Sequence, residues 1–170
     1  MMTMVVMIVA LFSSAVAQSL VPPLVWLAQA KAPFLFGLVV YYALMRPGKI
    51  MVTAAFAAGL LHDALSFVPL GYTSLFFCAA GFLIFRFRDV VVADSPWTAA
   101  LVGSVLAGAI TPATYWALAS DGGGRDFPLW WVGIKSAGTA LLGLAAIPVV
   151  FAVFLKVERL LGIVKKRESR

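Results

Sequence analysis

Long apolar runs separated by short clusters of charged residues dominate the chain. A transmembrane helix needs roughly 20 mostly apolar residues, and somewhat fewer when neighbouring helices hold its ends. The spacing of the charges therefore predicts about six helices. Their expected ranges are 3–21, 31–46, 50–66, 71–87, 97–119 and 128–155. The second and third are short, and residues 46–49 between them combine Pro47 with two cations, which predicts a tight turn at an interface.

The segment between the first two predicted helices is apolar but not helical in pattern. Pro22 and Pro23 end the first helix, and residues 24–30 carry Trp26, whose amphipathic ring suits a membrane interface. We expect a re-entrant or surface-lying segment here. The first charge in the chain is Lys31, whereas a cleaved signal peptide begins with a basic region, so the first apolar run is expected to be a retained span. The small residues at 15–17 match a cleavage pattern and leave cleavage as the alternative.

Composition supports a membrane protein. Hydrophobic residues make up 63% of the 170, the mean hydropathy is +1.02, and only 12% of residues are charged, against about 25% in soluble domains. A water-soluble fold of this size cannot cover so much apolar surface. The expected fold is all-α, one polytopic membrane bundle over residues 1–155. The last apolar run is longer than a bilayer needs, which predicts a tilted helix leading into a basic cytoplasmic tail at 156–170.

The cations are strongly biased to one side of the six-helix arrangement. The first side receives Arg46, Lys49, Arg86, Arg88, Lys156, Arg159, Lys165, Lys166, Arg167 and Arg170. The other side receives Lys31 and Arg125, with Lys135 inside the sixth helix. Because cytoplasmic loops collect Lys and Arg, both termini are expected in the cytoplasm. The basic side then faces anionic lipid headgroups, which explains the net charge of +6 without a nucleic-acid partner.

Three ionisable residues lie in or at the edge of apolar helices, namely His62, Asp63 and Lys135. A charge in the hydrocarbon region costs a few kcal/mol, so each should face the bundle interior or reach water. Asp63 and Lys135 are expected within roughly 10 Å of the same membrane surface and are candidates for an ion pair. The alternative is that Lys135 extends to the interface while Asp63 caps the following turn. His62 is expected to be a hydrogen-bonded interior residue.

Small residues recur at helix-packing spacing. Ala99, Gly103 and Ala107 share one face of the fifth predicted helix, with Ser104 and Gly108 beside it, and Ala55 and Gly59 lie on the third. Such faces allow two helix backbones to approach each other closely in lipid. They predict packing inside the bundle or, alternatively, a face for a partner protein.

The sequence lacks recognisable catalytic signatures. It contains no His-Glu-x-x-His, no Gly-x-Ser-x-Gly and no phosphate-binding glycine loop followed by Lys. Cys78 is the one cysteine and His62 the one histidine, so neither a disulfide within the chain nor a Cys/His metal site is expected. We expect no cofactor. Ser66 lies four residues after His62, but a hydrolase would also need an oxyanion hole that no motif indicates.

The most specific string covers residues 58–71. Asp63 or Ser66 can accept hydrogen bonds from backbone donors freed where the helix ends, while Pro69 and Gly71 enforce a turn into the next helix. The string also resembles the Gly-Leu-Leu-x-Asp-x-x-Ser-x-x-Pro-Leu-Gly stretch of the bacterial rod shape-determining MreD family. The matching residues are Gly59, Leu60, Leu61, Asp63, Ser66, Pro69, Leu70 and Gly71.

This resemblance implies a non-enzymatic component of the cell-elongation machinery in the bacterial inner membrane. It implies work with the single-span protein MreC and, through it, with the wall synthase pair of a glycosyltransferase and a transpeptidase and with the MreB filament. The family looks like a relative in fold of the substrate-binding membrane subunits of energy-coupling-factor vitamin transporters, which supply the alternative function. Such a subunit needs a polar pocket reached from outside, and the sequence shows few polar residues there, so a scaffold that binds an MreC-like protein is the favoured hypothesis.

The charge bias predicts that both termini are cytoplasmic and that residues 121–126 are outside the cell. In a Cys78→Ser background, Gly123→Cys is expected to react with a membrane-impermeant maleimide on intact cells. Labelling that requires prior disruption of the membrane would reverse the orientation.

Overall fold

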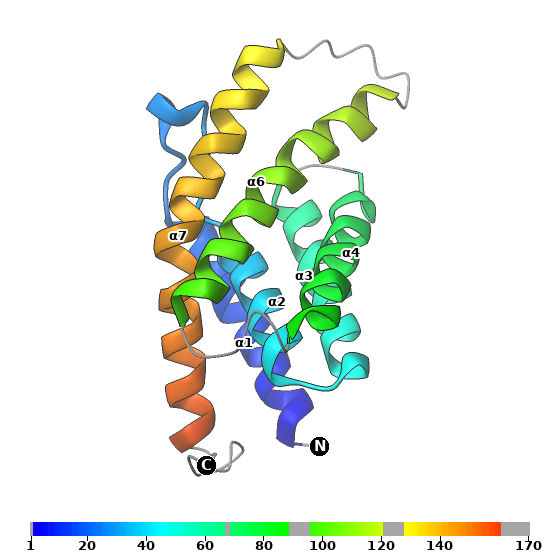
Figure 1. The fold of residues 1–170 in the computed structure, drawn as a ribbon, viewed down its shortest axis with the longest axis vertical. Helices are drawn as coiled ribbons and strands as arrows, with labels where there is room; N and C mark the ends of the chain where they lie inside the picture. Colours follow the sequence, from blue (N-terminus) through cyan, green and yellow to red (C-terminus); the bar gives the residue numbers. More distant parts are fainter. Residues whose placement is uncertain (1, 67–68, 89–95, 121–127, 161–170) are drawn as a thin grey trace.

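The described part of the chain is a bundle of six α-helices and one short 3-10 turn (Figure 1). The computed structural model describes residues 2–66, 69–88, 96–120 and 128–160. The helices are α1 (Met2–Leu20), α2 (Phe34–Met45), α3 (Gly48–Ser66), α4 (Tyr72–Arg86), α6 (Pro96–Ser120) and α7 (Leu129–Leu160), with η1 at Val25–Leu27. The expected all-helical bundle is confirmed, and most helix ends fall within a few residues of their expected positions.

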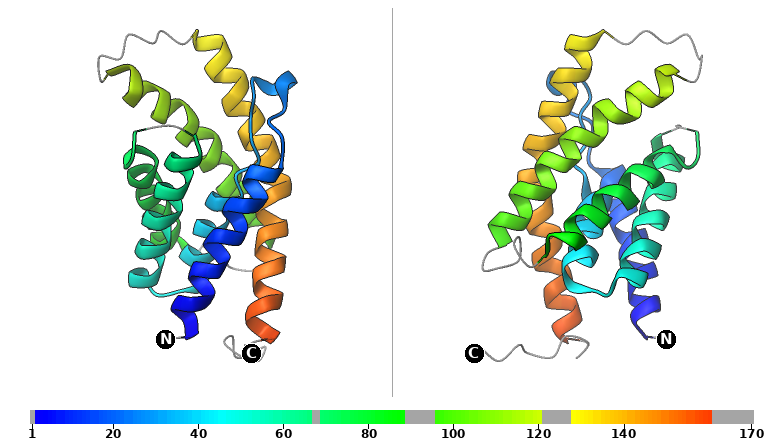
Figure 2. Two further views of the ribbon diagram at one scale, coloured as in Figure 1. Left: turned by 180° about the vertical axis from the view of Figure 1, so that it is seen from behind. Right: turned by 45° about the vertical axis from the view of Figure 1, so that its right-hand side comes forward.

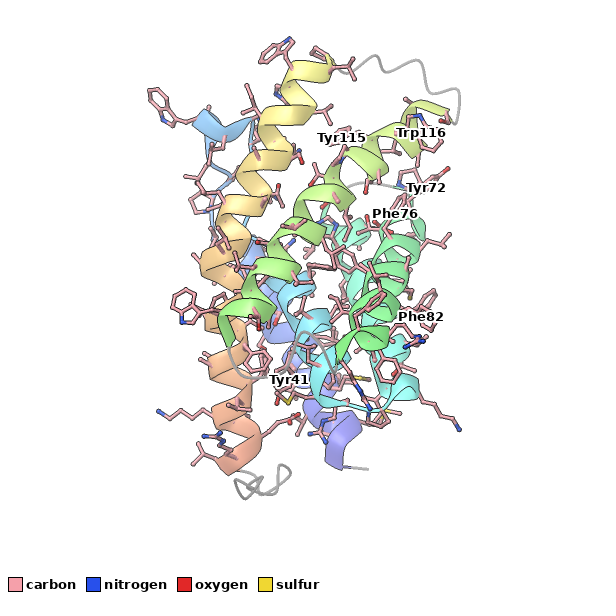
Figure 3. All side chains as sticks on the ribbon, viewed as in Figure 1. Tyr41, Tyr72, Phe76, Phe82, Tyr115 and Trp116 are labelled. Atoms are coloured by element: carbon pink, nitrogen blue, oxygen red, sulfur yellow. The ribbon has the colours of Figure 1, made fainter. Side chains whose placement is uncertain are left out.

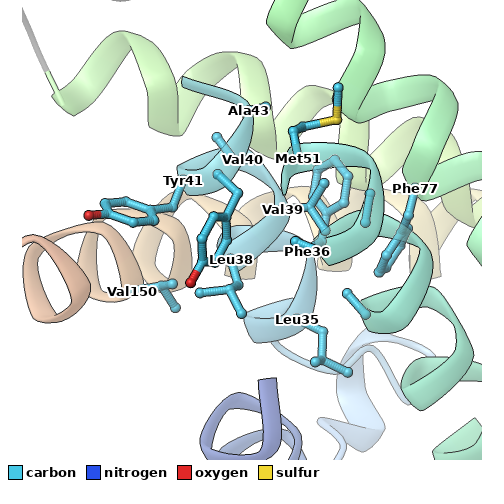
Figure 4. Packing of buried hydrophobic residues seen from close by; sticks show 14 of the residues in the cluster. Leu35, Phe36, Leu38, Val39, Val40, Tyr41, Ala43, Met51, Phe77 and Val150 are labelled. Atoms are coloured by element: carbon cyan, nitrogen blue, oxygen red, sulfur yellow. The ribbon is translucent and has the colours of Figure 1, made fainter. Parts of the chain in front are cut away.

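The core of the bundle is α2. It is apolar on every side, as expected for a helix that is surrounded by others, and all ten residues from Leu35 to Leu44 are buried. The other five helices pack around it. Figure 4 shows the α2 side chains among Met51 of α3, Phe77 of α4 and Val150 of α7. At 12 residues α2 is about 18 Å long, so it crosses only part of a bilayer by itself.

The outside of the bundle is also apolar, which fits a lipid environment. On α1 the side chains of Val5, Val9, Phe12 and Val16 form an exposed stripe. Three helices are long and apolar enough to cross a membrane, at Gly48–Ser66, Trp97–Ser120 and Leu129–Leu160. The remaining three are shorter apolar helices. The chain is therefore a membrane protein by helix length and composition, while a count of six passes remains a prediction.

The two ends of the bundle differ in charge. Figures 1 and 2 place the start of α1, the α2–α3 connection, the end of α4 and the end of α7 at one end, here called the basic end. The described cations on these parts are Arg46, Lys49, Arg86, Arg88, Lys156 and Arg159. The opposite end holds the α3–α4 turn, η1, the end of α6 and the start of α7. The described cations thus segregate as the sequence predicted.

The segment from residue 21 to residue 33 lies at the opposite end and turns back on itself. Leu24 pairs with Ala30 in an isolated bridge, and Ala28 and Gln29 adopt positive φ angles of 51° and 60°. Trp26 is 95% exposed, so the segment lies on the surface rather than re-entering the bundle. Its return to the core is fixed by Gln18 of α1, whose Oε1 accepts a hydrogen bond from the Leu35 N–H at 3.2 Å. A free backbone donor at the start of α2 is satisfied in this way.

A buried ion pair joins α2 to α7 at the basic end. Arg46 Nη2 lies 2.5 Å from Glu158 Oε2, and the Tyr41 hydroxyl donates to the same oxygen at 2.8 Å. Glu158 is only 1% exposed. Burial lowers the pKa of Arg46, but the hydrogen bond and the charge of Glu158 raise it more, so the net shift is upward and the guanidinium stays charged.

Helix α7 extends past the expected end of the sixth helix at residue 155. Residues 156–160 were expected in a basic tail, whereas α7 continues to Leu160 and packs Glu158 against the end of α2. A charge in the apolar interior needs a partner, and Arg46 supplies it. Residues 161–170, the remainder of the expected tail, lie outside the described residues.

Removing one member of the pair is expected to destabilise the protein by roughly 3–5 kcal/mol, because the other charge is left buried. Arg46→Met should be more harmful than Glu158→Gln, since Glu158 is less exposed than the Arg46 side chain, which is 14% exposed. Thermal unfolding in neutral detergent measures the effect. The double variant should regain part of the lost stability. Arg159→Gln, a change at an exposed neighbour, should leave the unfolding temperature almost unchanged. Equal loss in all four proteins would contradict a specific pair.

Candidate functional site

The conspicuous string at residues 58–71 forms the junction between α3 and α4. The two helices approach so closely at Gly59 that a Cβ there would lie 2.2 Å from the Ser74 Cα and 2.6 Å from its backbone nitrogen. No side chain fits in that space. Across the same contact, the Ser74 hydroxyl donates to the Phe56 carbonyl at 3.3 Å. Gly59 is therefore required by the packing of α4 against α3.

Asp63 caps the N-terminus of α4 from the neighbouring helix. Its Oδ2 accepts the Gly71 N–H at 2.8 Å, and its Oδ1 accepts the Thr73 N–H at 3.3 Å. The residue is fully buried. A helix start leaves backbone donors without partners and carries a partial positive charge, so a carboxylate is stabilised there. The buried charge and the free donors of α4 satisfy each other.

Glycine is also required at residue 71, for a different reason. Gly71 has a φ of 108°, which L side chains rarely adopt, although a Cβ there would meet no other atom. Pro69 precedes it in the turn, and Leu70 is 70% exposed. Ser66 is the last residue of α3 and is half-buried at the wall of a cavity. Asp63, not Ser66, is the residue that caps the turn.

The expected ion pair between Asp63 and Lys135 does not form. Both oxygens of Asp63 are occupied by backbone donors, whereas the Lys135 Nζ donates to the Tyr115 hydroxyl at 2.7 Å. That amine also lies 4.8 Å from the centre of the Trp131 ring, a favourable cation–π arrangement. The helix N-terminus supplies the positive partner that Lys135 was expected to provide, so the alternative in which Asp63 caps the turn is the one the structure contains.

The expected small-residue face of α6 is internal packing. Ala99 and Ala107 are each 4% exposed, and a Cβ on Gly103 would lie 2.8 Å from Ile147 of α7 and 3.1 Å from Val40 of α2. This face holds α6 against α7 and the core. In the described structure these residues contact other helices of the same bundle.

One contact between α6 and α7 depends on a proline. Pro112 lacks the N–H that would bond to the Gly108 carbonyl one turn earlier, and the Ser136 hydroxyl of α7 donates to that carbonyl instead, at 2.6 Å. Gly108 lets α7 come near, because a Cβ there would lie 2.9 Å from the Ala140 Cβ. Beyond this contact the two helices diverge toward the opposite end (Figure 2, right).

A cavity of about 500 Å³ lies at the opposite end, where α6 and α7 diverge. Its walls come from α1, the 21–33 segment, α2, α3, α4, α6 and α7. The polar residues among them are Gln18, Gln29, Lys31, His62, Ser66, Thr73, Thr111, Thr114, Tyr115, Lys135 and Thr139. Figure 3 shows Tyr115 on the part of α6 that borders this region. A cavity of this size is typical of small-molecule sites.

Sequence reasoning missed this cavity because it considered mainly charged residues. A signal was nevertheless present, since Thr111, Thr114 and Tyr115 follow the i, i+3, i+4 spacing of one helix face, and Lys135 and Thr139 follow the same rule on α7. No sequence pattern indicates that Gln18 and the 21–33 segment line the cavity, because their position depends on how that segment folds over the bundle.

Two polar atoms beside the cavity have no partner in the described structure. These are His62 Nδ1 and Thr73 Oγ1, both buried. The His62 ring lies 5.7 Å from the Phe77 ring, so its surroundings are largely apolar. The expectation that His62 is hydrogen-bonded is therefore not met at Nδ1.

A second hollow is an apolar groove on the outside of the bundle, between α4 and α6. It has a volume of about 440 Å³ and lies toward the basic end. Its lining is wholly apolar, formed by Leu83, Ile84, Phe87, Leu101, Val102, Val105 and Leu106. The groove exists because α6 packs mainly on α7 and α4 mainly on α3, which leaves α4 and α6 less closely packed on each other.

Comparison with known proteins identifies a family. The family model of rod shape-determining protein MreD matches residues 1–111, which is more than half of the chain and includes the α3–α4 junction. No curated protein and no solved structure matches. The matched part also contains α2 and every residue that lines the apolar groove.

Gly59→Ala is expected to destabilise the protein by about 3 kcal/mol or more, the upper range for overpacking, because the new methyl group meets backbone rather than a movable side chain. Gly133→Ala on α7 is a matched control, since a Cβ there meets no atom within 4 Å. The amount of folded protein and its thermal unfolding temperature measure both. Equal behaviour of the two variants would show that α3 and α4 are not in such close contact.

Proposed function

The chain belongs to the MreD family of rod shape-determining proteins, and we propose that it binds the transmembrane helix of an MreC-like partner in the apolar groove between α4 and α6. Family membership makes the chain a membrane component of the rod-shape machinery. Beyond family membership, we propose the partner, the place of contact and a mode of action by binding, without catalysis. The observation that carries it is the wholly apolar groove on the lipid-facing side of the bundle.

The groove suits a helix because of its shape and chemistry. Between apolar helices in lipid there is little hydrophobic driving force, so association depends on close packing of complementary surfaces. A hollow between two helices accepts the large side chains of a third helix. Leu101 and Val105 of α6 lie one turn apart at its edge and are 55% and 67% exposed, so they are accessible to such side chains.

The chemistry of the groove supports binding rather than catalysis. None of its lining residues can donate or accept a proton or act as a nucleophile. An MreC-like protein is proposed as the link to the wall synthase glycosyltransferase and transpeptidase and to the MreB filament. In this arrangement the basic end faces the cytoplasm and anionic lipid headgroups, with Lys49, Arg86 and Lys156 near the filament side.

The polar cavity favours a second candidate function. A substrate-binding subunit of an energy-coupling-factor vitamin transporter needs a pocket of this kind, and the cavity of about 500 Å³ provides more polar groups than the sequence suggested. The two candidates are distinguishable by what accompanies the purified protein. A vitamin-sized ligand retained without any bound protein favours the transporter subunit, whereas a bound single-span protein favours the scaffold.

Disulfide cross-linking tests the proposed contact. In a Cys78→Ser background, Val105→Cys is expected to cross-link to single cysteines scanned along the transmembrane helix of the MreC-like partner. Reactive partner positions should recur every three or four residues, because one helical face is in contact. Leu141→Cys on α7 is the matched control, since Leu141 is 61% exposed and is not part of the groove.

A groove-filling change gives a second measurement of the same contact. Val105→Trp should lower co-purification with the partner at least severalfold while expression stays near normal, because Val105 is exposed. Leu141→Trp should leave co-purification unchanged. If cross-links form at Leu141→Cys and not at Val105→Cys, the partner binds elsewhere and the groove faces lipid.

A further inference from the structure

We infer that the polar cavity at the opposite end binds a ligand with an anionic group, such as a phosphate or carboxylate, held by Lys31 and Lys135. This inference is independent of the proposed partner contact, because the cavity and the apolar groove share no lining residue.

The charge of the cavity lining is positive. Among the described residues that line it, Lys31 and Lys135 are the cations and none is Asp or Glu. Asp63 directly follows the lining residue His62 in the sequence, but its carboxylate is buried and accepts a hydrogen bond from the start of α4. Within the described residues, neither lysine has a carboxylate oxygen within 4.0 Å. An anion in the cavity would therefore experience a favourable field with no competing negative charge from its walls.

Lys135 is held where it can act on a ligand. Its hydrogen bond to Tyr115 and its position over the Trp131 ring keep the ammonium between α6 and α7. Because an ammonium has three donors, the single bond to Tyr115 leaves capacity for an anionic oxygen. Lys31 lines the cavity and is exposed, so its long side chain is free to turn toward an anion held there.

Hydroxyl and amide groups add further recognition. Thr111, Thr114 and Thr139 line the cavity and are half-buried. Deeper in, Thr73 Oγ1 and His62 Nδ1 lack protein partners, and buried polar groups without partners are uncommon in folded proteins. In the present conformation both atoms are closed off from the cavity space, so a ligand would reach them after rotation of these side chains.

The rest of the wall is apolar, which defines the class of ligand further. Phe36, Phe77, Ile110 and Leu118 line the same cavity. A molecule that combines an anionic group with an apolar portion satisfies both kinds of wall. Two sources supply this chemistry, namely the headgroup region of an anionic membrane lipid and a water-soluble organic anion.

The test uses the full chain in neutral detergent and native mass spectrometry. The probes are dihexanoyl phosphatidylglycerol, the matched zwitterionic lipid dihexanoyl phosphatidylcholine, and phenyl phosphate as the soluble anion. Both lipids carry a phosphate, but the trimethylammonium group of phosphatidylcholine is repelled by the two lysines, so we expect phosphatidylglycerol to bind about tenfold more tightly. Binding of phenyl phosphate as well as phosphatidylglycerol shows that a soluble anion suffices. Binding of the lipid alone identifies the lipid source.

Variants show whether the cavity is the site. Lys135→Met should remove most of the preference for the anionic lipid, whereas Lys156→Met, an exposed lysine at the other end of the same helix, should leave it intact. Lys31→Met provides a second cavity variant at an exposed position, and it should reduce the preference about fivefold. Equal binding of both lipids, no binding of any probe, or an anion preference that survives both cavity variants would overturn the inference.

Discussion

The carboxylate of Asp63 has to be neutralised inside an apolar bundle, and the geometry of one half of the protein depends on how this is done. Asp63 is fully buried, so its charge needs donors from the protein. The start of α4 supplies the N–H groups of Gly71 and Thr73. This requirement fixes where α4 begins relative to α3, and Gly59 allows the two backbones to meet at that register. The family motif is therefore a packing and capping device.

The bundle contains two tightly packed helix pairs that meet around α2. In the α3–α4 pair the close contact is made at Gly59, and in the α6–α7 pair it is made at Gly103, Gly108 and Gly143. Between the pairs, α4 and α6 are less closely packed on each other, and the apolar groove lies there. The polar cavity lies at the opposite end, where α6 diverges from α7.

The two hollows differ in chemistry because they lie at different ends of α6. Toward the basic end, α6 presents Leu101 and Val105, and the groove there is apolar. Around Pro112, at positions 111, 114 and 115, it presents Thr111, Thr114 and Tyr115 to the interior, and the cavity there is polar. Pro112 leaves the Gly108 carbonyl without its helical donor, and the Ser136 hydroxyl donates to that carbonyl instead. This hydrogen bond joins α6 to α7 at the point from which the two helices diverge. Helix α6 thus lines both the lipid-facing groove and the interior cavity.

The sequence by itself determined the helices, the membrane character and the segregation of the cations, because these depend on the local spacing of apolar and charged residues. It also identified the α3–α4 turn, since Pro69 and Gly71 act locally. It did not determine which groups meet across the bundle. Asp63 was predicted to pair with Lys135 or to cap the turn, and only the packing at Gly59 decided this by bringing the start of α4 to the carboxylate. The Arg46–Glu158 pair and the cavity join residues that are far apart in the chain, so only the tertiary structure placed them together.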